Sequence, residues 1–299
     1  MKTKSGLVSI GNGSLSARTP GAGRFSYLLI TAVLLVGFRT VPAQAAESPR
    51  YNEQDLIAVL QSDSPPAEKA ITCKRLAVFG SEAAVPALAP LLTDPHLNSW
   101  ARIALEAIPG PAADMALRQA IDKTQGLLLV GVLNSIGVRR DAQAVPALAA
   151  RLDDPDSQVA SAAAVALGRI GNLETAKILN EALAKAPAAT RASVAEGCIR
   201  CAEHLFADGK SGDAVKLYDT VRKSQAPKQK VLEATRGAIL ARKSGGVSLL
   251  VEQLRSADKG FFQIGLTTAR ELPGGKATKA VEAELRRAAP DRQPAMLLA

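Results

Sequence analysis

Aromatic residues, cysteine and histidine are scarce in this sequence of 299 residues. Phe, Trp and Tyr make up 3% of the chain, which has only three cysteines and two histidines. Three cysteines exclude a disulfide-dense scaffold. Because 47% of the residues are apolar and 22% are charged, a disordered or fibrous chain is excluded as well. The core must therefore be built from small aliphatic side chains.

The formal charge of +9 gives little support for a nucleic-acid partner. Five basic residues and no acidic one precede residue 46, so removal of that leader leaves about +4. The five are Lys2, Lys4, Arg18, Arg24 and Arg39. We expect no binding to nucleic acid.

The leader itself has the order of a secretory signal. A basic stretch is followed by the apolar run 25–38 (FSYLLITAVLLVGF) and then by Ala43-Gln44-Ala45. The run is shorter than the roughly 20 residues that span a bilayer, so retention as an anchor is the weaker alternative. We expect cleavage of residues 1–45 and export of residues 46–299 to the periplasm or outside the cell, with no stable membrane span after cleavage.

From Tyr51 onward, apolar pairs at positions i and i+4 recur with a nearly constant step. Seven steps of 29–38 residues separate the first members of eight pairs, which indicates a repeat architecture. The pairs are Leu56/Leu60, Leu88/Leu92, Leu117/Ile121, Leu148/Leu152, Leu179/Leu183, Leu217/Val221, Leu250/Leu254 and Val281/Leu285. Alternating patterns suited to strands are absent from the sequence. We therefore predict an all-α solenoid of about eight antiparallel helical pairs.

Second helices are expected at 100–108, 125–136, 158–170 and 262–272. Three second helices end in glycine (Gly80, Gly137 and Gly171), the residue favoured where the chain leaves a helix at positive φ. Asp94-Pro95 and Asp154-Pro155 each separate a first helix from a second one, and we expect the Asp to cap the following helix while Pro occupies its first turn.

Two segments carry a resemblance to a known family. Residues 82–93 (EAAVPALAPLLT) and 142–153 (AQAVPALAARLD) are each followed by Asp-Pro, and the second also by 158–171 (QVASAAAVALGRIG). These segments resemble HEAT repeats of the short type found in phycobilin-lyase-like proteins, in particular exported bacterial arrays. The resemblance covers residues 54–299 and implies a HEAT-like superhelix, often attached to other domains, but it implies almost nothing about function.

One unit departs from the period. The 38-residue step between Leu179 and Leu217, with Pro227 close behind, resembles a tetratricopeptide-like unit near 195–227, with longer helices at 188–207 and 211–224. At the other end, an expected first helix at 276–287 is followed by only a short apolar stretch. We therefore expect the natural protein to continue beyond Ala299 into at least one further repeat.

Chemically reactive patterns are weak. Cys198, Cys201 and His204 share one face of a predicted helix. A c-type haem needs His directly after the second Cys, where Ala202 stands, and structural zinc needs a fourth ligand. We interpret the cysteines as packing residues, and we expect no catalytic residue, cofactor or metal.

Residues 208–243 carry nine basic and four acidic side chains, a local charge of +5. Solvated outer helix faces explain this better than an anion-binding patch. As a possible interaction surface we single out five residues, Trp100, Arg222, Lys223, Lys228 and Lys230. Trp100 fits either an exposed anchor or a core position beside Ile103.

Three classes of function remain open. The first is a non-catalytic scaffold with protein partners, since a solenoid offers a long binding surface. The second is the repeat region of a larger exported enzyme whose catalytic domain lies beyond residue 299. The third is an enzyme built on the repeat, which the resemblance to bilin lyases and HEAT-like DNA glycosylases suggests and which export opposes.

Overall fold

The computed structural model describes residues 51–298, and within that range the chain forms sixteen α-helices and no strand. The odd-numbered helices are α1 (Glu53–Gln61), α3 (Val85–Leu88), α5 (Pro111–Ala120), α7 (Val145–Ala150), α9 (Leu173–Lys185), α11 (Ser211–Lys223), α13 (Val247–Arg255) and α15 (Gly275–Leu285). The even-numbered helices are α2 (Pro66–Phe79), α4 (Asn98–Ala107), α6 (Gly126–Arg139), α8 (Ser157–Ile170), α10 (Ala188–Ala207), α12 (Lys228–Ala241), α14 (Lys259–Glu271) and α16 (Gln293–Leu297).

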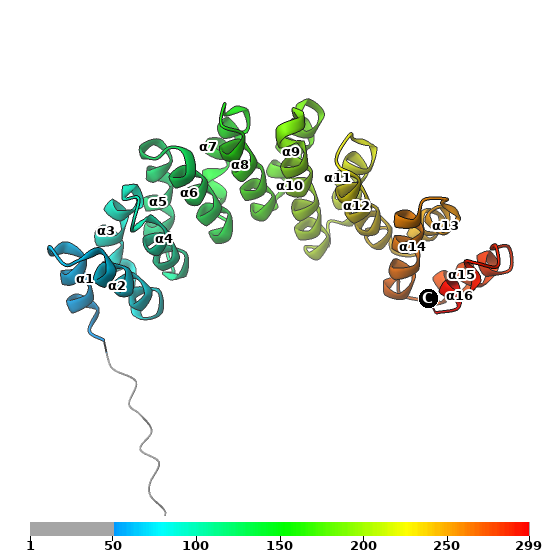
Figure 1. The fold of residues 1–299 in the computed structure, drawn as a ribbon, viewed down its shortest axis with the longest axis horizontal. Helices are drawn as coiled ribbons and strands as arrows, with labels where there is room; N and C mark the ends of the chain where they lie inside the picture. The colour runs from blue at the N-terminus through cyan, green and yellow to red at the C-terminus, as the bar shows by residue number, and fades with distance from the viewer. Residues whose placement is uncertain (1–50, 299) are drawn as a thin grey trace, which may run out of the picture. The chain divides into compact units, whose positions relative to one another are not determined.

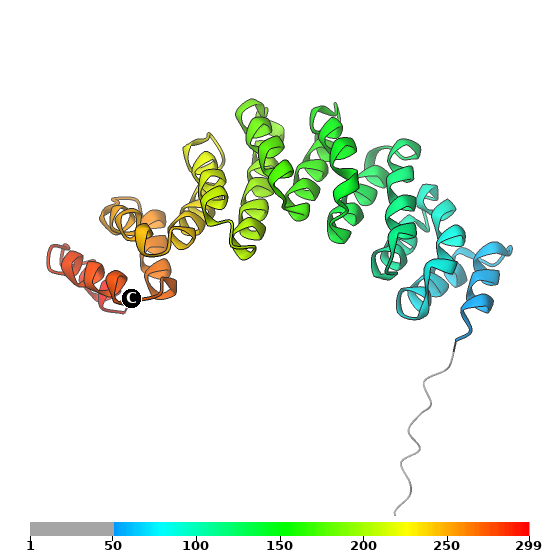
Figure 2. The same cartoon turned by 180° about the vertical axis from the view of Figure 1, so that it is seen from behind.

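The helices form eight consecutive pairs (Figure 1). Each odd-numbered helix packs on the even-numbered helix that follows it, and each even-numbered helix from α2 to α12 also packs on the next even-numbered helix. Seen from behind, the same succession of pairs is visible (Figure 2). The prediction of an all-α solenoid of about eight helical pairs is confirmed.

The i,i+4 pairs lie on the odd-numbered helices or on the 3-10 turns that extend them. Fourteen of the sixteen side chains are buried, and Leu152 and Leu285 are half-buried against the core. Each i,i+4 residue pair forms an apolar stripe on its helix, and this stripe is buried only when the helix packs on its neighbours.

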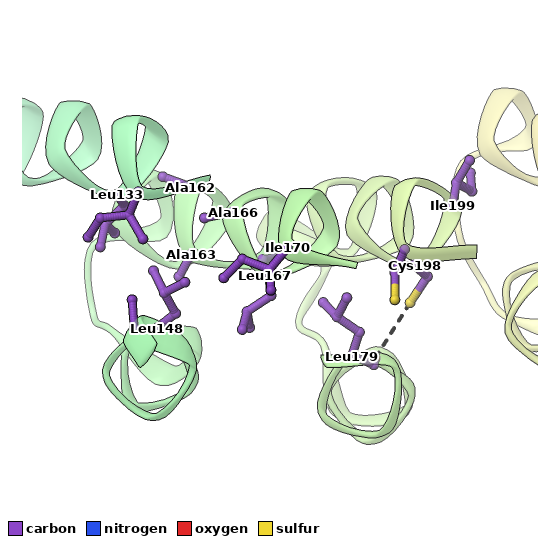
Figure 3. Packing of buried hydrophobic residues seen from close by; sticks show 14 of the residues in the cluster. Leu133, Leu148, Ala162, Ala163, Ala166, Leu167, Ile170, Leu179, Cys198 and Ile199 are labelled. Atoms are coloured by element: carbon purple, nitrogen blue, oxygen red, sulfur yellow. Dashed lines mark hydrogen bonds between the residues drawn. The ribbon is translucent and has the colours of Figure 1, made fainter. Parts of the chain in front are cut away.

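Alanine and glycine bring the even-numbered helices close together at α8 and α10. Ala163 and Ala166 of α8 are fully buried (Figure 3), and so is Ala164. A Cβ atom added at Gly168 would lie 2.4 Å from the carbonyl oxygen of Gly197 on α10. The small side chains therefore explain the low aromatic content, because large rings would not fit between these backbones.

Gly80 and Gly171 end helices as predicted, but only Gly171 does so at positive φ, and Gly137 does not end a helix. Gly171 ends α8 in the left-handed region, with φ of 66°. Gly80 follows α2 in an extended conformation, with φ of −79°. At Gly137, α6 continues to Arg139, and Arg140 takes the left-handed conformation. Gly137 instead permits close packing, since a Cβ there would lie 2.8 Å from the Cα of Ala166 on α8.

The expected role of the Asp-Pro pairs is also wrong in detail. Asp94 accepts hydrogen bonds from the amides of His96 and Leu97, so it stabilises the turn that precedes α4. Asp154 does the same for the amide of Asp156, and Asp156 is the residue that caps α8. Pro155 therefore lies before the cap and not in the first helical turn.

The longer repeat step is explained by α10. This helix has 20 residues, whereas α8 and α12 have 14 each. The bounds of α10 and α11 agree with the predicted longer helices at 188–207 and 211–224. The resemblance of this unit to a tetratricopeptide repeat stays a prediction.

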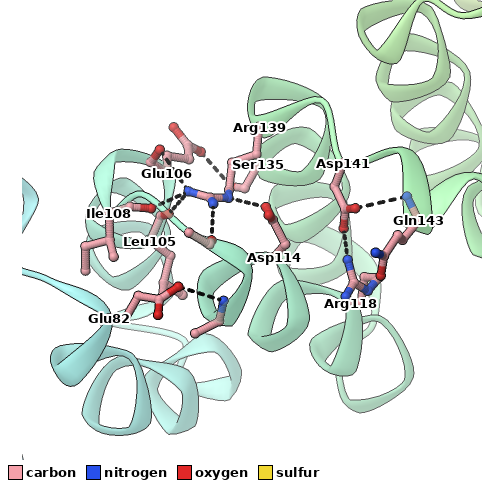
Figure 4. A network of polar contacts seen from close by, with 12 residues as sticks. Glu82, Leu105, Glu106, Ile108, Asp114, Arg118, Ser135, Arg139, Asp141 and Gln143 are labelled. Atoms are coloured by element: carbon pink, nitrogen blue, oxygen red, sulfur yellow. Dashed lines mark hydrogen bonds and ion pairs between the residues drawn. The ribbon is translucent and has the colours of Figure 1, made fainter.

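Arginine side chains join neighbouring pairs through the ends of helices. Arg139, at the end of α6, donates hydrogen bonds to the carbonyl oxygens of Leu105 (2.7 Å), Ile108 (2.6 Å) and Gly110 (2.9 Å), and it pairs with Asp114 (Figure 4). The carbonyls at the end of α4 have no partner within their own helix, and the guanidinium supplies one. Arg139 is thus a link between the second and third pairs.

The last described helix is short. Met296 of α16 is buried, while Leu297 and Leu298 are exposed. The expected continuation beyond Ala299 stays a prediction.

Among residues 51–298, no helix combines the length and the apolar character needed to cross a bilayer. The proposed signal, residues 1–45, lies outside the described residues.

Candidate functional site

The structure does not gather the five predicted interaction residues into one surface. Trp100 lies on α4, half-buried against the core. Trp100 thus lies between the two predicted alternatives: it packs on the core, while the neighbouring Ile103 is 45% exposed. The four basic residues lie in two groups, Arg222 and Lys223 at the end of α11, and Lys228 and Lys230 in the first turn of α12.

Three of these basic residues are neutralised by ion pairs. The side chain of Arg222 lies 2.8 Å from Asp219, that of Lys228 lies 2.6 Å from Asp258, and that of Lys230 lies 2.5 Å from Glu196. Lys223 is exposed, and no ion pair is found for it among the described residues. Asp258 and Glu196 lie outside the 208–243 window, so a count of charges along the sequence overestimates the positive charge of this surface.

Both carboxylate partners of Lys230, Glu196 and Glu233, line a hollow on the even-numbered helices. It is a groove of about 650 Å³ between α10 and α12, which we call the α10–α12 groove. Its apolar lining comes from Ile199 and Phe206 of α10, Tyr218 of α11, Leu232 and Leu240 of α12, and Ile264 of α14. Its charged residues are Glu196, Arg200, Glu203, Glu233 and Arg236. This volume is in the range of ligand-binding clefts.

Tyr218 of α11 and Gly237 of α12 pack together in the wall of the α10–α12 groove. Tyr218 is only 3% exposed, and a Cβ atom at Gly237 would lie 2.4 Å from the tyrosine ring. A larger residue at 237 would therefore displace the ring. Burial, reinforced by the negative charge of Glu203, raises the pKa of the Tyr218 phenol, which stays protonated at neutral pH.

Most of the charged residues of the groove are in ion pairs. Glu196 accepts contacts from Arg200 (2.6 Å) and Lys230 (2.5 Å), and Lys230 also reaches Glu233 (2.8 Å). Hydrogen bonds from Lys230, with the charges of Lys230 and Arg200, outweigh burial and lower the pKa of Glu196. Arg236 donates to Glu271 at 3.0 Å. Glu203, in contrast, has no ion pair among the residues the structure describes.

A second hollow, which contains the predicted residue Arg222, is more polar. Arg222 lines a hollow of about 600 Å³ with Thr235, Ser248, Glu252 and Arg255. Arg222 pairs with Asp219 and Arg255 with Glu284, so both cations already have carboxylate partners. The α10–α12 groove, with its apolar walls and its unpaired carboxylate, is the stronger candidate for a binding site.

The cysteines belong to the core. Cys198 and Cys201 are fully buried, and the thiol of Cys198 donates to the carbonyl oxygen of Leu179 at 3.6 Å (Figure 3). Burial raises the pKa of both thiols. His204 packs against Gly171 at the end of α8. No cluster of three or more metal-ligating side chains is found among residues 51–298.

The acidic turn at 153–156 also has a structural role. Asp154 pairs with Arg151 at 3.5 Å, and Asp156 caps α8 by accepting from the amide of Gln158.

Comparison with known proteins finds a family match for part of the chain. A family model described as HEAT repeats matches residues 128–199, which include most of α6, all of α7 to α9 and the first part of α10. Together with the eight helical pairs, this match supports a HEAT-like repeat architecture for the described residues. A search of curated protein sequences finds no match.

Solved structures with a similar chain course include three of different kinds. One is an engineered protein, with 19% identity over 81% of this chain and 76% of that chain, and a TM-score of 0.43. Another is human deoxyhypusine hydroxylase in complex with glycerol, with 23% identity over 72% and 82%, and a TM-score of 0.40. A third is the CpcE–CpcF complex of phycocyanin lyase from Nostoc sp. PCC7120, with 19% identity over 85% and 95%, and a TM-score of 0.36.

Sequence reasoning missed the groove and Glu203. One signal was present in the sequence. Apolar residues recur about two helical turns apart on two helices, at Ile199 and Phe206 and at Leu232 and Leu240, and all four line the groove. The second signal was Gly237, because a glycine in the interior of a helix often marks a place where another group packs closely against the backbone.

Proposed function

We propose that this chain is a non-catalytic binding scaffold that is exported and that holds a protein partner on its even-numbered helices. The repeat architecture supports a binding role, because consecutive helices present a long continuous surface. The observation that carries the proposal is the α10–α12 groove, in which half-buried Phe206 and Leu232 line a hollow edged by charged side chains. An apolar centre with a charged rim is the usual anatomy of a protein interface.

Export rests on the N-terminal sequence. Basic residues, the apolar run 25–38 and Ala43-Gln44-Ala45 occur in the order of a cleavable signal. The mature protein would begin at Ala46 and act in the periplasm or outside the cell.

Site-specific photo-crosslinking tests the binding role. A photo-crosslinking amino acid is placed at Gln229, which lines the groove, or at Glu174, an exposed position on α9. In the full-length protein in its own host, the groove position should give a discrete adduct with one protein, and the α9 position should not. Equal adducts from both positions, or turnover of a small substrate by the purified chain without any adduct, would contradict a scaffold role.

A further inference from the structure

The apolar part of the α10–α12 groove can take one or two side chains of a ligand. Ile199 is buried, whereas Phe206, Leu232, Leu240 and Ile264 each keep part of their surface open. Burial of that surface against an apolar side chain is favourable, at about 25 cal/mol for each Å² removed from water. Filled pockets of this kind are where the binding energy of protein interfaces concentrates.

The charge of the groove favours one sign of ligand. Arg200, Lys230 and Arg236 all have carboxylate partners within 3.0 Å. Glu203 lines the same groove without an ion pair among the described residues. One carboxylate therefore remains available for a cation that a ligand brings.

The electrostatic environment of Glu203 also favours a cationic ligand. Although the residue is exposed, the pKa of its carboxyl is raised above the ordinary value, first by partial burial in the groove, and the positive charges of Arg200 and Arg236 oppose that shift while Glu196 and Glu233 add to it. The two nearby cations are already engaged, so they do not satisfy the carboxylate. A ligand cation would stabilise its charged form.

We infer that the α10–α12 groove binds an extended or helical segment of a partner protein that places an apolar side chain on Phe206 and Leu232 and a Lys or Arg against Glu203. The inference rests on the proposed binding function and adds the chemistry of the partner. The apolar contact supplies affinity, and the ion pair selects a basic segment over an acidic one.

The probe is a phage-displayed library of random twelve-residue peptides, selected on the immobilised full-length chain. Enriched peptides should share an apolar residue next to Lys or Arg. One of them is then synthesised with a fluorescent label, together with a version in which its basic residue is replaced by Gln, and the affinities are measured by fluorescence anisotropy.

Glu203→Gln should weaken binding of the basic peptide about fivefold, as expected for a partly exposed ion pair. The same variant should bind the Gln version of the peptide as the wild type does, so the two changes are coupled in a double-mutant cycle. Glu174→Gln, an exposed glutamate on α9 without a described ion pair, is the matched control and should change neither affinity. Leu232→Glu should reduce binding of both peptides at least tenfold, with the melting temperature measured to verify folding.

Two results would overturn the inference in different ways. Enriched peptides whose affinity is indifferent to Glu203→Gln and to Leu232→Glu would place binding elsewhere and leave the scaffold function standing. A library that yields no enriched peptide would count against the scaffold function as well. Because Glu203 is exposed, its variant should fold, and the cycle remains informative even where Leu232→Glu does not.

Discussion

The close approach of α8 and α10 makes the effect of adding one methyl group calculable. A Cβ atom at Gly197 would lie 2.4 Å from the carbonyl oxygen of Ala164 and 3.1 Å from Cδ2 of Leu179. The first contact is with backbone, which cannot rotate away as a long side chain can. Gly197→Ala therefore forces the two helices apart, and with them the fourth and fifth pairs.

The expected cost is the difference of two effects. Alanine is favoured over glycine in a helix by about 1 kcal/mol, whereas overpacking of a tight interface costs about 1–3 kcal/mol. A contact at 2.4 Å with backbone falls at the upper end of that range. We expect Gly197→Ala to lower the free energy of unfolding by about 1–2 kcal/mol.

Gly212→Ala is the matched control. Gly212 lies in the first turn of α11, and nothing lies within 4 Å of an added Cβ. This variant should gain about 0.5 kcal/mol from helix propensity alone. Urea denaturation followed by circular dichroism measures both variants, and amide hydrogen exchange shows whether the loss is centred on α8 and α10. Equal stability of the two variants would refute the argument that glycine is needed at 197 for close packing.

Three further changes have expected outcomes. Arg139→Ala should cost about 2–4 kcal/mol in a urea titration, because it leaves the carbonyls at the end of α4 unpaired, and Arg139→Lys should recover only part of the loss. The thiols of Cys198 and Cys201 should react with a disulfide reagent only on unfolding, and zinc or a chelator should leave the melting temperature unchanged; a fall of many degrees with chelator would indicate a metal site. Hydrogen bonds from Arg255 lower the pKa of Glu284 below 4.5, so the stability it contributes is present above about pH 4.5 and is lost as the pH falls. Glu284→Gln should therefore flatten the acid limb of a stability–pH curve, and an unchanged limb would exclude this pair as its source.

Helix ends and charges were harder to predict than the repeat. Gly80 and Gly137 were expected to end helices at positive φ, and neither does. The physical reason at Gly137 is contact with Ala166 on another helix, which spacing along the chain does not reveal. The basic character of residues 208–243 was similarly overestimated, because Lys228 and Lys230 find carboxylates on α14 and α10.

The apolar i,i+4 pairs of the sequence were by themselves enough to predict the fold. A stripe such as Leu179/Leu183 is local and periodic, and a short helix that carries one must pack against neighbours, so the number and order of helical pairs follow from the sequence. The α10–α12 groove was decided only by tertiary structure. Glu203 and Leu232 lie on different helices, and whether a carboxylate is paired depends on every cation that packing brings near it. The apolar i,i+4 pairs repeat because the apolar stripe of every helix must be buried against a neighbour. A groove forms where neighbouring helices leave apolar side chains partly exposed, and only the packed structure shows where that happens.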